Sequence, residues 1–145
     1  MHCRSSTATD KSHTCDLDDA VGKIAREKCT RDLDAIRALW RIGDIVNSLR
    51  ATVAHGSWRA TLALCAARVG VHPKSLDEAA RAATAFPASK RDDLIRGFVA
   101  TGRSVQPSHI VALARVSPAR RARGLEALRS SALSVRELRS FLRMS

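Results

Sequence analysis

The chain has very few residues that favour β-sheet. It contains no Tyr, and its two Trp and three Phe make up 3% of the 145 residues. Gly and Pro are also scarce, with seven and four residues, whereas apolar residues account for 45%. Ala, Leu and Arg, which favour helix, are instead abundant. This composition predicts an all-α fold with enough apolar residues for a core.

A long apolar run is also missing. No stretch approaches the roughly 18 apolar residues that span a bilayer, and the first 15 residues lack the apolar core of a signal peptide. We therefore expect a cytoplasmic protein that has no membrane partner.

The cysteines form no CxxC pair, which favours reduced thiols. There are four of them: Cys3, Cys15, Cys29 and Cys65. Together with His2 and His13, the first two place soft metal ligands close together, but the spacing matches no zinc motif. We expect no cofactor, and the sequence leaves metal binding by this segment open.

The net charge is strongly positive and unevenly distributed. Lys and Arg number 25 against 14 Asp and Glu, which gives +11, and the isoelectric point is near 10.9. Residues 1–34 carry six basic and seven acidic side chains, residues 35–87 seven and three, and residues 88–145 twelve and four. The excess lies in the C-terminal half, in a range typical of proteins that bind nucleic acid.

The first 56 residues divide into a tail and two expected helices. Residues 1–15 are polar and without periodicity, which predicts a disordered tail. Apolar residues then recur at i, i+3, i+4 and i+7 from Leu17 to about Lys28, which predicts one helix. Thr30 is a candidate cap for a second helix that continues to about Val53. Residues 16–56 are therefore expected to form an N-terminal helical pair.

Residues 57–145 read as a series of short helices separated by Gly, Pro and Ser. Ser57 and Ser89 are expected caps, and Ser134 with Glu137 forms an S-x-x-E capping box. Helices are expected over residues 58–69, 73–86, 90–101, 108–116, 119–130 and 135–143. The whole chain is thus predicted to be a multi-helix bundle of about eight helices. In the first of these segments we expect the apolar stripe to consist of Ala60, Leu64 and Ala67.

The segment LALCAARVGVHPKSLDEAAR has the spacing of a helix-turn-helix. Such a unit needs a small residue where two helices touch, a Gly for a left-handed turn, and apolar residues on the second helix that cover the first. Counted from Leu62, these positions are filled by Ala66, Gly70, Val71, Leu76 and Ala79. Any αα-hairpin with a Gly turn can match so short a motif, so a purely architectural role stays open.

If the unit reads DNA, its second helix is the recognition helix, whose N-terminal residues face the bases. His72, Lys74, Ser75 and Arg81 are the candidate DNA-binding residues there. Asp77 and Glu78 would repel phosphate. The alternative is that these two acids only favour the start of the helix, with Arg81 paired to one of them across a turn.

Residues 58–143 resemble the helical DNA-binding domain of the ParB family, including its KorB relatives. In that family a helix-turn-helix is followed by a proline, a helix ending in Gly, a Ser-His helix leading to Ala-Leu, and a Ser-Val-Arg-Glu-Leu helix. The corresponding residues here are Pro87, Leu94–Gly102, Ser108-His109, Ala112-Leu113 and Ser134–Leu138. Residues 42–87 are also similar to small uncharacterised phage and plasmid helical proteins.

The resemblance implies a fold and DNA binding, and it adds Ser108 and His109 near the DNA backbone. Nothing in residues 1–57 resembles the family's nucleotide-binding motif, and no segment resembles its C-terminal dimerisation domain, so no nucleotide role is implied. His109 has an alternative role in packing. The run Arg120, Arg121 and Arg123 supplies further candidate phosphate contacts, with a solvated surface as the alternative.

No convergent catalytic set is recognisable, so we do not expect an enzyme. The first hypothesis is a protein that binds double-stranded DNA, as a helix-turn-helix regulator or an accessory partition or maintenance factor. The alternative is a non-catalytic adaptor that binds a protein partner through residues 17–53, and an exposed apolar stripe there would favour it. A homodimer through Thr30–Val53 would reconcile both, because two-fold DNA readers need two recognition helices.

Overall fold

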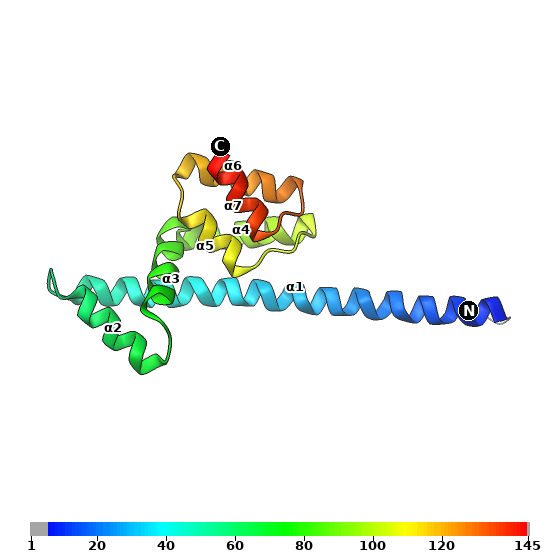
Figure 1. Cartoon of the computed structure of the whole chain (residues 1–145), viewed down its shortest axis with the longest axis horizontal. Helices are drawn as coiled ribbons and strands as arrows, with labels where there is room; N and C mark the ends of the chain where they lie inside the picture. Colours follow the sequence, from blue (N-terminus) through cyan, green and yellow to red (C-terminus); the bar gives the residue numbers. More distant parts are fainter. Residues whose placement is uncertain (1–5, 145) are drawn as a thin grey trace. The chain divides into compact units, whose positions relative to one another are not determined.

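The computed structural model describes the backbone of residues 6–144 and the side chains of residues 16–144. Within this range it is all-helical, with seven helices and no strand (Figure 1). The helices are α1 (Ser6–Thr52), α2 (Trp58–Val69), α3 (Pro73–Ala85), α4 (Ala88–Thr101), α5 (Pro107–Ala114), α6 (Pro118–Ser130) and α7 (Val135–Met144). The all-α prediction is confirmed.

The predicted break between two N-terminal helices is wrong, because α1 is one helix through Thr30. No Gly or Pro lies between Lys28 and Leu33 to end a helix, and an isolated Thr costs little inside one. Residues 6–15 of the expected tail also belong to α1, and residues 1–5 lie outside the described part of the chain.

The chain forms two compact units, with the boundary between Arg31 and Asp32. Unit 1 comprises residues 1–31. Its described side chains are almost all exposed, and they include Leu17, Val21 and Ile24. An ion pair of 3.0 Å between Lys23 Nζ and Asp19 Oδ2 links successive turns of the helix.

Unit 2, residues 32–145, holds the hydrophobic core. Helix α3 packs against α2 and α5, and it approaches α1 most closely at Gly43. A Cβ on Gly43 would lie 2.0 Å from the carbonyl oxygen of Ala79 and 2.7 Å from the Cβ of Ala83. Only a residue without a side chain fits this crossing. The largest fully buried side chains include Trp40 and Phe98, as expected for core aromatics.

Local chemistry sets most helix ends in unit 2. Gly70 ends α2 and Gly102 ends α4, each with a positive φ (84° and 65°). Ser134 and Glu137 form the predicted capping box. The Ser134 backbone nitrogen lies 2.8 Å from Glu137 Oε1, and the Glu137 backbone nitrogen lies 3.1 Å from Ser134 Oγ. Ser89 is not a cap, because α4 already begins at Ala88 after Pro87.

The predicted stripe of α2 lies on the wrong face of the helix. Ala60, Leu64 and Ala67 are exposed, whereas Ala66 is fully buried with Leu62 and Cys65 packed beside it. Helix α2 is rich in Ala and Leu on every side, so its periodicity does not select a single face.

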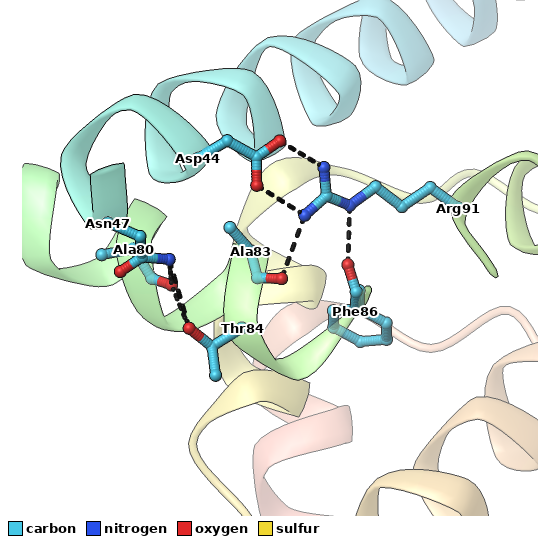
Figure 2. A network of polar contacts seen from close by, with 7 residues as sticks. All are labelled: Asp44, Asn47, Ala80, Ala83, Thr84, Phe86 and Arg91. Atoms are coloured by element: carbon cyan, nitrogen blue, oxygen red, sulfur yellow. Dashed lines mark hydrogen bonds and ion pairs between the residues drawn. The ribbon is translucent and has the colours of Figure 1, made fainter. Parts of the chain in front are cut away.

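Two arginines hold the carboxyl end of α3. Arg91 of α4 donates to the carbonyl oxygens of Phe86 (2.6 Å) and Ala83 (3.0 Å) and forms two bonds of 2.6 and 2.9 Å with Asp44 of α1 (Figure 2). Arg121 of α6 donates to the carbonyl oxygen of Ala85 at 3.5 Å. These cations satisfy helix carbonyls that have no intrahelical partner.

The Arg91 network also acts on its neighbours. Its guanidinium lies 5.5 Å from the centroid of the buried Trp40 ring. Hydrogen bonds from Arg91 lower the pKa of the Asp44 carboxyl group. On the other side of the crossing, the Asn47 side chain donates to the Ala80 carbonyl oxygen at 3.1 Å (Figure 2).

Among the described residues, no helix combines the length and apolar character needed to cross a membrane.

Candidate nucleic-acid interface

The segment 58–85 folds as a helix-turn-helix built on α2 and α3. Gly70 adopts the left-handed conformation, and its N–H donates to the Ala66 carbonyl oxygen at 2.9 Å. His72 caps α3, because its Nδ1 accepts a hydrogen bond of 3.0 Å from the Lys74 backbone N–H. Pro73 occupies the first turn, where its missing N–H costs nothing.

The residues that the spacing assigns to the interior of this unit are buried. Ala66, Leu76 and Ala79 are all below a tenth exposed, and Val46 of α1 joins the same apolar cluster. The end of α1 therefore supplies the third helix of a tri-helical unit, which is the arrangement of helix-turn-helix DNA readers. Val71 of the turn is exposed, so it does not contribute to this interior.

The beginning of α3 points candidate side chains to solvent. His72, Lys74 and Ser75 are exposed. Arg81 is also exposed, and it forms an ion pair of 3.7 Å with Asp77 one turn away, as the alternative interpretation expected. Glu78 pairs with Arg115 at the end of α5. Both acids on α3 are thus neutralised by arginines, which reduces their repulsion of a phosphate.

A hollow of about 620 Å³ opens where the end of α1, the start of α2 and the start of α3 converge. We call it the lysine hollow, because Lys74 lines it. Arg50, Arg59 and His72 line it as well, against the single acid Asp77. The Arg50 guanidinium lies 5.4 Å from the centroid of the Trp58 ring, which also lines the hollow.

A second, smaller hollow of about 180 Å³ is formed by α5, α6 and α7. We call it the arginine hollow, because four arginines line it: Arg115, Arg120, Arg139 and Arg143. Arg115 connects it to α3 through the ion pair with Glu78. Four guanidinium groups around one depression create a strong local positive potential that favours an anionic ligand.

Arg50, Arg59 and Arg115 were not among the sequence candidates. They are distant in the sequence and line the two hollows only because helix ends converge. Arg59 in the first turn of α2 had an available signal, since this position of a helix-turn-helix lies near the DNA backbone.

Two of the sequence candidates are internal. His109 is 4% exposed; its Nδ1 accepts from the Gln106 N–H at 3.0 Å, and its Nε2 lies 2.8 Å from the Leu133 carbonyl oxygen. This pattern corresponds to a neutral ring that donates from Nε2. His109 therefore ties α5 to the segment before α7 and presents no polar atom to DNA.

Arg121 is also occupied within the protein. It donates to the carbonyl oxygens of Leu113 (3.1 Å) and Val116 (3.0 Å) in addition to that of Ala85, and its guanidinium lies 5.7 Å from the Phe86 ring centroid. Burial lowers the pKa of this guanidinium. The two flanking arginines, Arg120 and Arg123, and Ser108 at the start of α5 are exposed.

The described residues contain no group of three or more His, Cys, Asp or Glu side chains that could hold a metal ion. The segment with His2, Cys3, His13 and Cys15 lies outside the described side chains. Cys29 and Cys65 are free, partly buried thiols.

Comparison with known proteins yields no family: no family model, curated protein or solved structure matches this chain.

Proposed function

We propose that this chain binds double-stranded DNA, with α3 as the recognition helix of a helix-turn-helix. The observation that carries the proposal is the exposed amino end of α3, where Lys74 and Ser75 face solvent beside the lysine hollow. In such units the start of the second helix reads base edges while the start of the first meets the phosphate backbone. Arg59 and Lys74 occupy these two places.

Electrostatics supports the same assignment. Three cations line the lysine hollow (Arg50, Arg59 and Lys74), and three further cations line the arginine hollow with no ion pair to a described acidic side chain (Arg120, Arg139 and Arg143). If each neutralises one phosphate, these six contacts give a log–log salt slope of about −5 for binding to duplex DNA. Neither hollow contains an arrangement of nucleophile, base or metal ligands that would favour catalysis.

The resemblance to the DNA-binding domain of ParB-type proteins supports the proposal at the level of function class. It favours a regulator or an accessory partition or maintenance factor that acts at the nucleoid. We carry over neither nucleotide binding nor His109, since that side chain is used inside the protein.

The test is fluorescence anisotropy of the full chain with a random duplex over a salt series. One variant combines Arg120→Ala, Arg139→Ala and Arg143→Ala, and we expect its slope to fall to between about −2 and −3, since three of six contacts are lost. The matched control combines Arg26→Ala, Lys90→Ala and Arg96→Ala, which removes the same charge from exposed positions outside both hollows. We expect the control to keep a slope near −5.

A second variant, Lys74→Ala with Ser75→Ala, tests the recognition helix. It leaves the His72 cap intact, because that bond uses the Lys74 backbone N–H. We expect weaker binding to the random duplex and a salt slope about one unit shallower, since Lys74 is one of the six proposed phosphate contacts. An equal change of the salt slope in the arginine variant and in its control would mean that binding depends on net charge and not on the arginine hollow.

The alternative function, an adaptor for a protein partner, is favoured by one observation. Leu17, Val21, Ile24, Ile42 and Ile45 on α1 are exposed, as that hypothesis requires. An absence of DNA binding even at low salt would leave the adaptor as the better proposal. A second copy of the chain would also cover these residues.

A further inference from the structure

Helix α1 carries an exposed apolar stripe in each unit. In unit 1 the stripe consists of Leu17, Val21 and Ile24, and in unit 2 of Ile42, Ile45 and Leu49. All are exposed except Leu49, which is half-buried. Ile45 alone is 70% exposed. Isolated surface apolar residues are ordinary, but regularly spaced β-branched and Leu residues mark a surface that is covered in the functional state.

The stripe of unit 2 does not belong to the core of that unit. The core side of α1 is formed by Trp40, Gly43 and Val46, which are buried. Ile45 follows the buried Gly43 by two positions, which places it about 200° around the helix, whereas Ile42 lies about 40° from the buried Val46, at the edge of the core side. Packing inside unit 2 therefore leaves Ile42 and Ile45 exposed to solvent.

The two stripes have matching spacing when read in opposite directions. Steps of four and three residues separate Leu17, Val21 and Ile24, and the same steps in reverse separate Leu49, Ile45 and Ile42. This alternation is the a/d pattern of a coiled coil. Two antiparallel copies of α1 would form layers that pair Leu17 with Leu49, Val21 with Ile45, and Ile24 with Ile42 of the other copy.

The residues between the stripes select the orientation. In the sequence the same alternation continues through Lys28, Arg31, Ala35 and Ala38. A parallel pair would stack Lys28 on Lys28 and Arg31 on Arg31, which places like charges in the seam. The antiparallel register instead sets Lys28 against Ala38 and Arg31 against Ala35, so that each long cation meets a small side chain.

Among the flanking charges, the pair of Glu27 and Arg41 favours this orientation, whereas Asp32 and Asp34 would each lie beside the same residue of the second copy, next to the two Arg31 side chains. The antiparallel register brings Glu27 of one copy beside Arg41 of the other, twice in each dimer. Both side chains are exposed. In the parallel orientation Glu27 would instead face Asp32 of the second copy, which carries the same sign of charge.

We propose that α1 is an antiparallel dimerisation helix, in which the unit 1 stripe of each copy packs on the unit 2 stripe of a second copy. The inference is independent of DNA binding, although a two-fold dimer would also supply two copies of α3. The matched spacing of the two stripes and the pairing of Glu27 with Arg41 select a second copy of the chain as the occupant.

The first experiment measures the oligomeric state of the full chain by sedimentation equilibrium over a concentration series. We expect a dimer, and we expect Val21→Asp to raise the dimer Kd at least about tenfold, since each dimer buries two such charges. Val99→Asp is the matched control: Val99 on α4 is 57% exposed against 56% for Val21, but it lies outside the stripes. The control is expected to keep the Kd of the unchanged chain.

The substituted side chains are exposed, so the monomer should keep its fold, which circular dichroism and thermal melting verify. A chain that is monomeric at every concentration would overturn the proposal and assign the stripes to a different protein. Equal Kd values for Val21→Asp and Val99→Asp would overturn it as well.

A charge exchange tests the orientation. Glu27→Lys and Arg41→Glu should each weaken the dimer several-fold, and their combination should restore it, because the pair is re-formed with reversed sign. A combined variant that is weaker than either single variant would refute the antiparallel register.

Discussion

Replacement of Gly43 by Ala tests the crossing of α1 and α3. In an open helix, Gly→Ala raises stability by about 1 kcal/mol because Ala loses less backbone entropy on folding. At Gly43 the added methyl group would lie 2.0 Å from the Ala79 carbonyl oxygen, whereas ordinary contact begins near 3.4 Å. The obstacle is backbone, so no rotamer change relieves it, and the two helices must separate by about 1.4 Å at this point.

The separation loosens the packing of buried side chains on both sides of the crossing. Overpacked sites cost about 1–3 kcal/mol and more when backbone must move, so we expect a net loss of about 2–4 kcal/mol after the helix-propensity gain is included. For a unit of this size that corresponds to a fall in Tm of about 10 °C. The loss should appear in urea unfolding as a lower midpoint with an unchanged slope.

Gly97→Ala is the matched control within the same unit. Gly97 is also inside a helix, but the nearest atom to its added methyl group is the Arg129 Nε at 3.9 Å. We expect this variant to gain about 0.5–1 kcal/mol. If Gly43→Ala melts at or above the temperature of the unchanged chain, the close approach of α1 and α3 is refuted.

Three further predictions concern unit 2. Arg91→Ala should lower the free energy of unfolding by about 2–4 kcal/mol, because the carbonyl groups and the carboxylate that Arg91 binds lose their partner. The control Arg96→Ala breaks an exposed ion pair and should change the free energy of unfolding by less than about 1 kcal/mol. Equal losses in the two variants would contradict a stabilising role of the Arg91 hydrogen bonds. The stability that Asp44 contributes should be complete above its ordinary pKa of 3.8 and disappear as the pH falls through the lowered pKa of the folded state. Asp44→Asn should therefore weaken the decrease in the free energy of unfolding at acidic pH. An unchanged decrease would contradict the contribution of Asp44. Ser134→Ala should lower the free energy of unfolding by about 1 kcal/mol, measured by thermal melting, because the α7 cap is lost, whereas Ser134→Thr should keep most of the stability of the unchanged chain. Equal melting temperatures of the two variants would argue against the cap.

Much of the fold follows from local sequence chemistry. Gly70 and Pro73 mark the turn between α2 and α3, and Ser134 marks the start of α7, because backbone conformation and capping act over a few residues. The continuity of α1 was missed, since a Thr that could cap a helix can also lie inside one, as Thr30 does. The buried face of α2 was missed as well, because packing selects among several similar apolar faces.

The sequence predicted the candidate site only where neighbouring residues form it. Lys74 and Ser75 could be placed at the exposed start of a helix from the motif alone. The internal role of Arg121 depends on carbonyl groups from two separate segments, the end of α3 and the end of α5, which no local pattern reveals. The two hollows likewise exist only after helix ends converge, so their arginines carry no shared signal in the sequence.

The grip of Arg91 and Arg121 on the carboxyl end of α3 has a consequence for adaptability. Because helices on several sides hold α3, its amide protons should exchange with solvent only when the whole of unit 2 opens. A helix so restrained cannot follow the contour of a partner by local refolding. In the proposed DNA complex, the adjustment to fit would therefore fall on the duplex, and sequences that bend at low cost would be favoured even at positions that the protein does not touch.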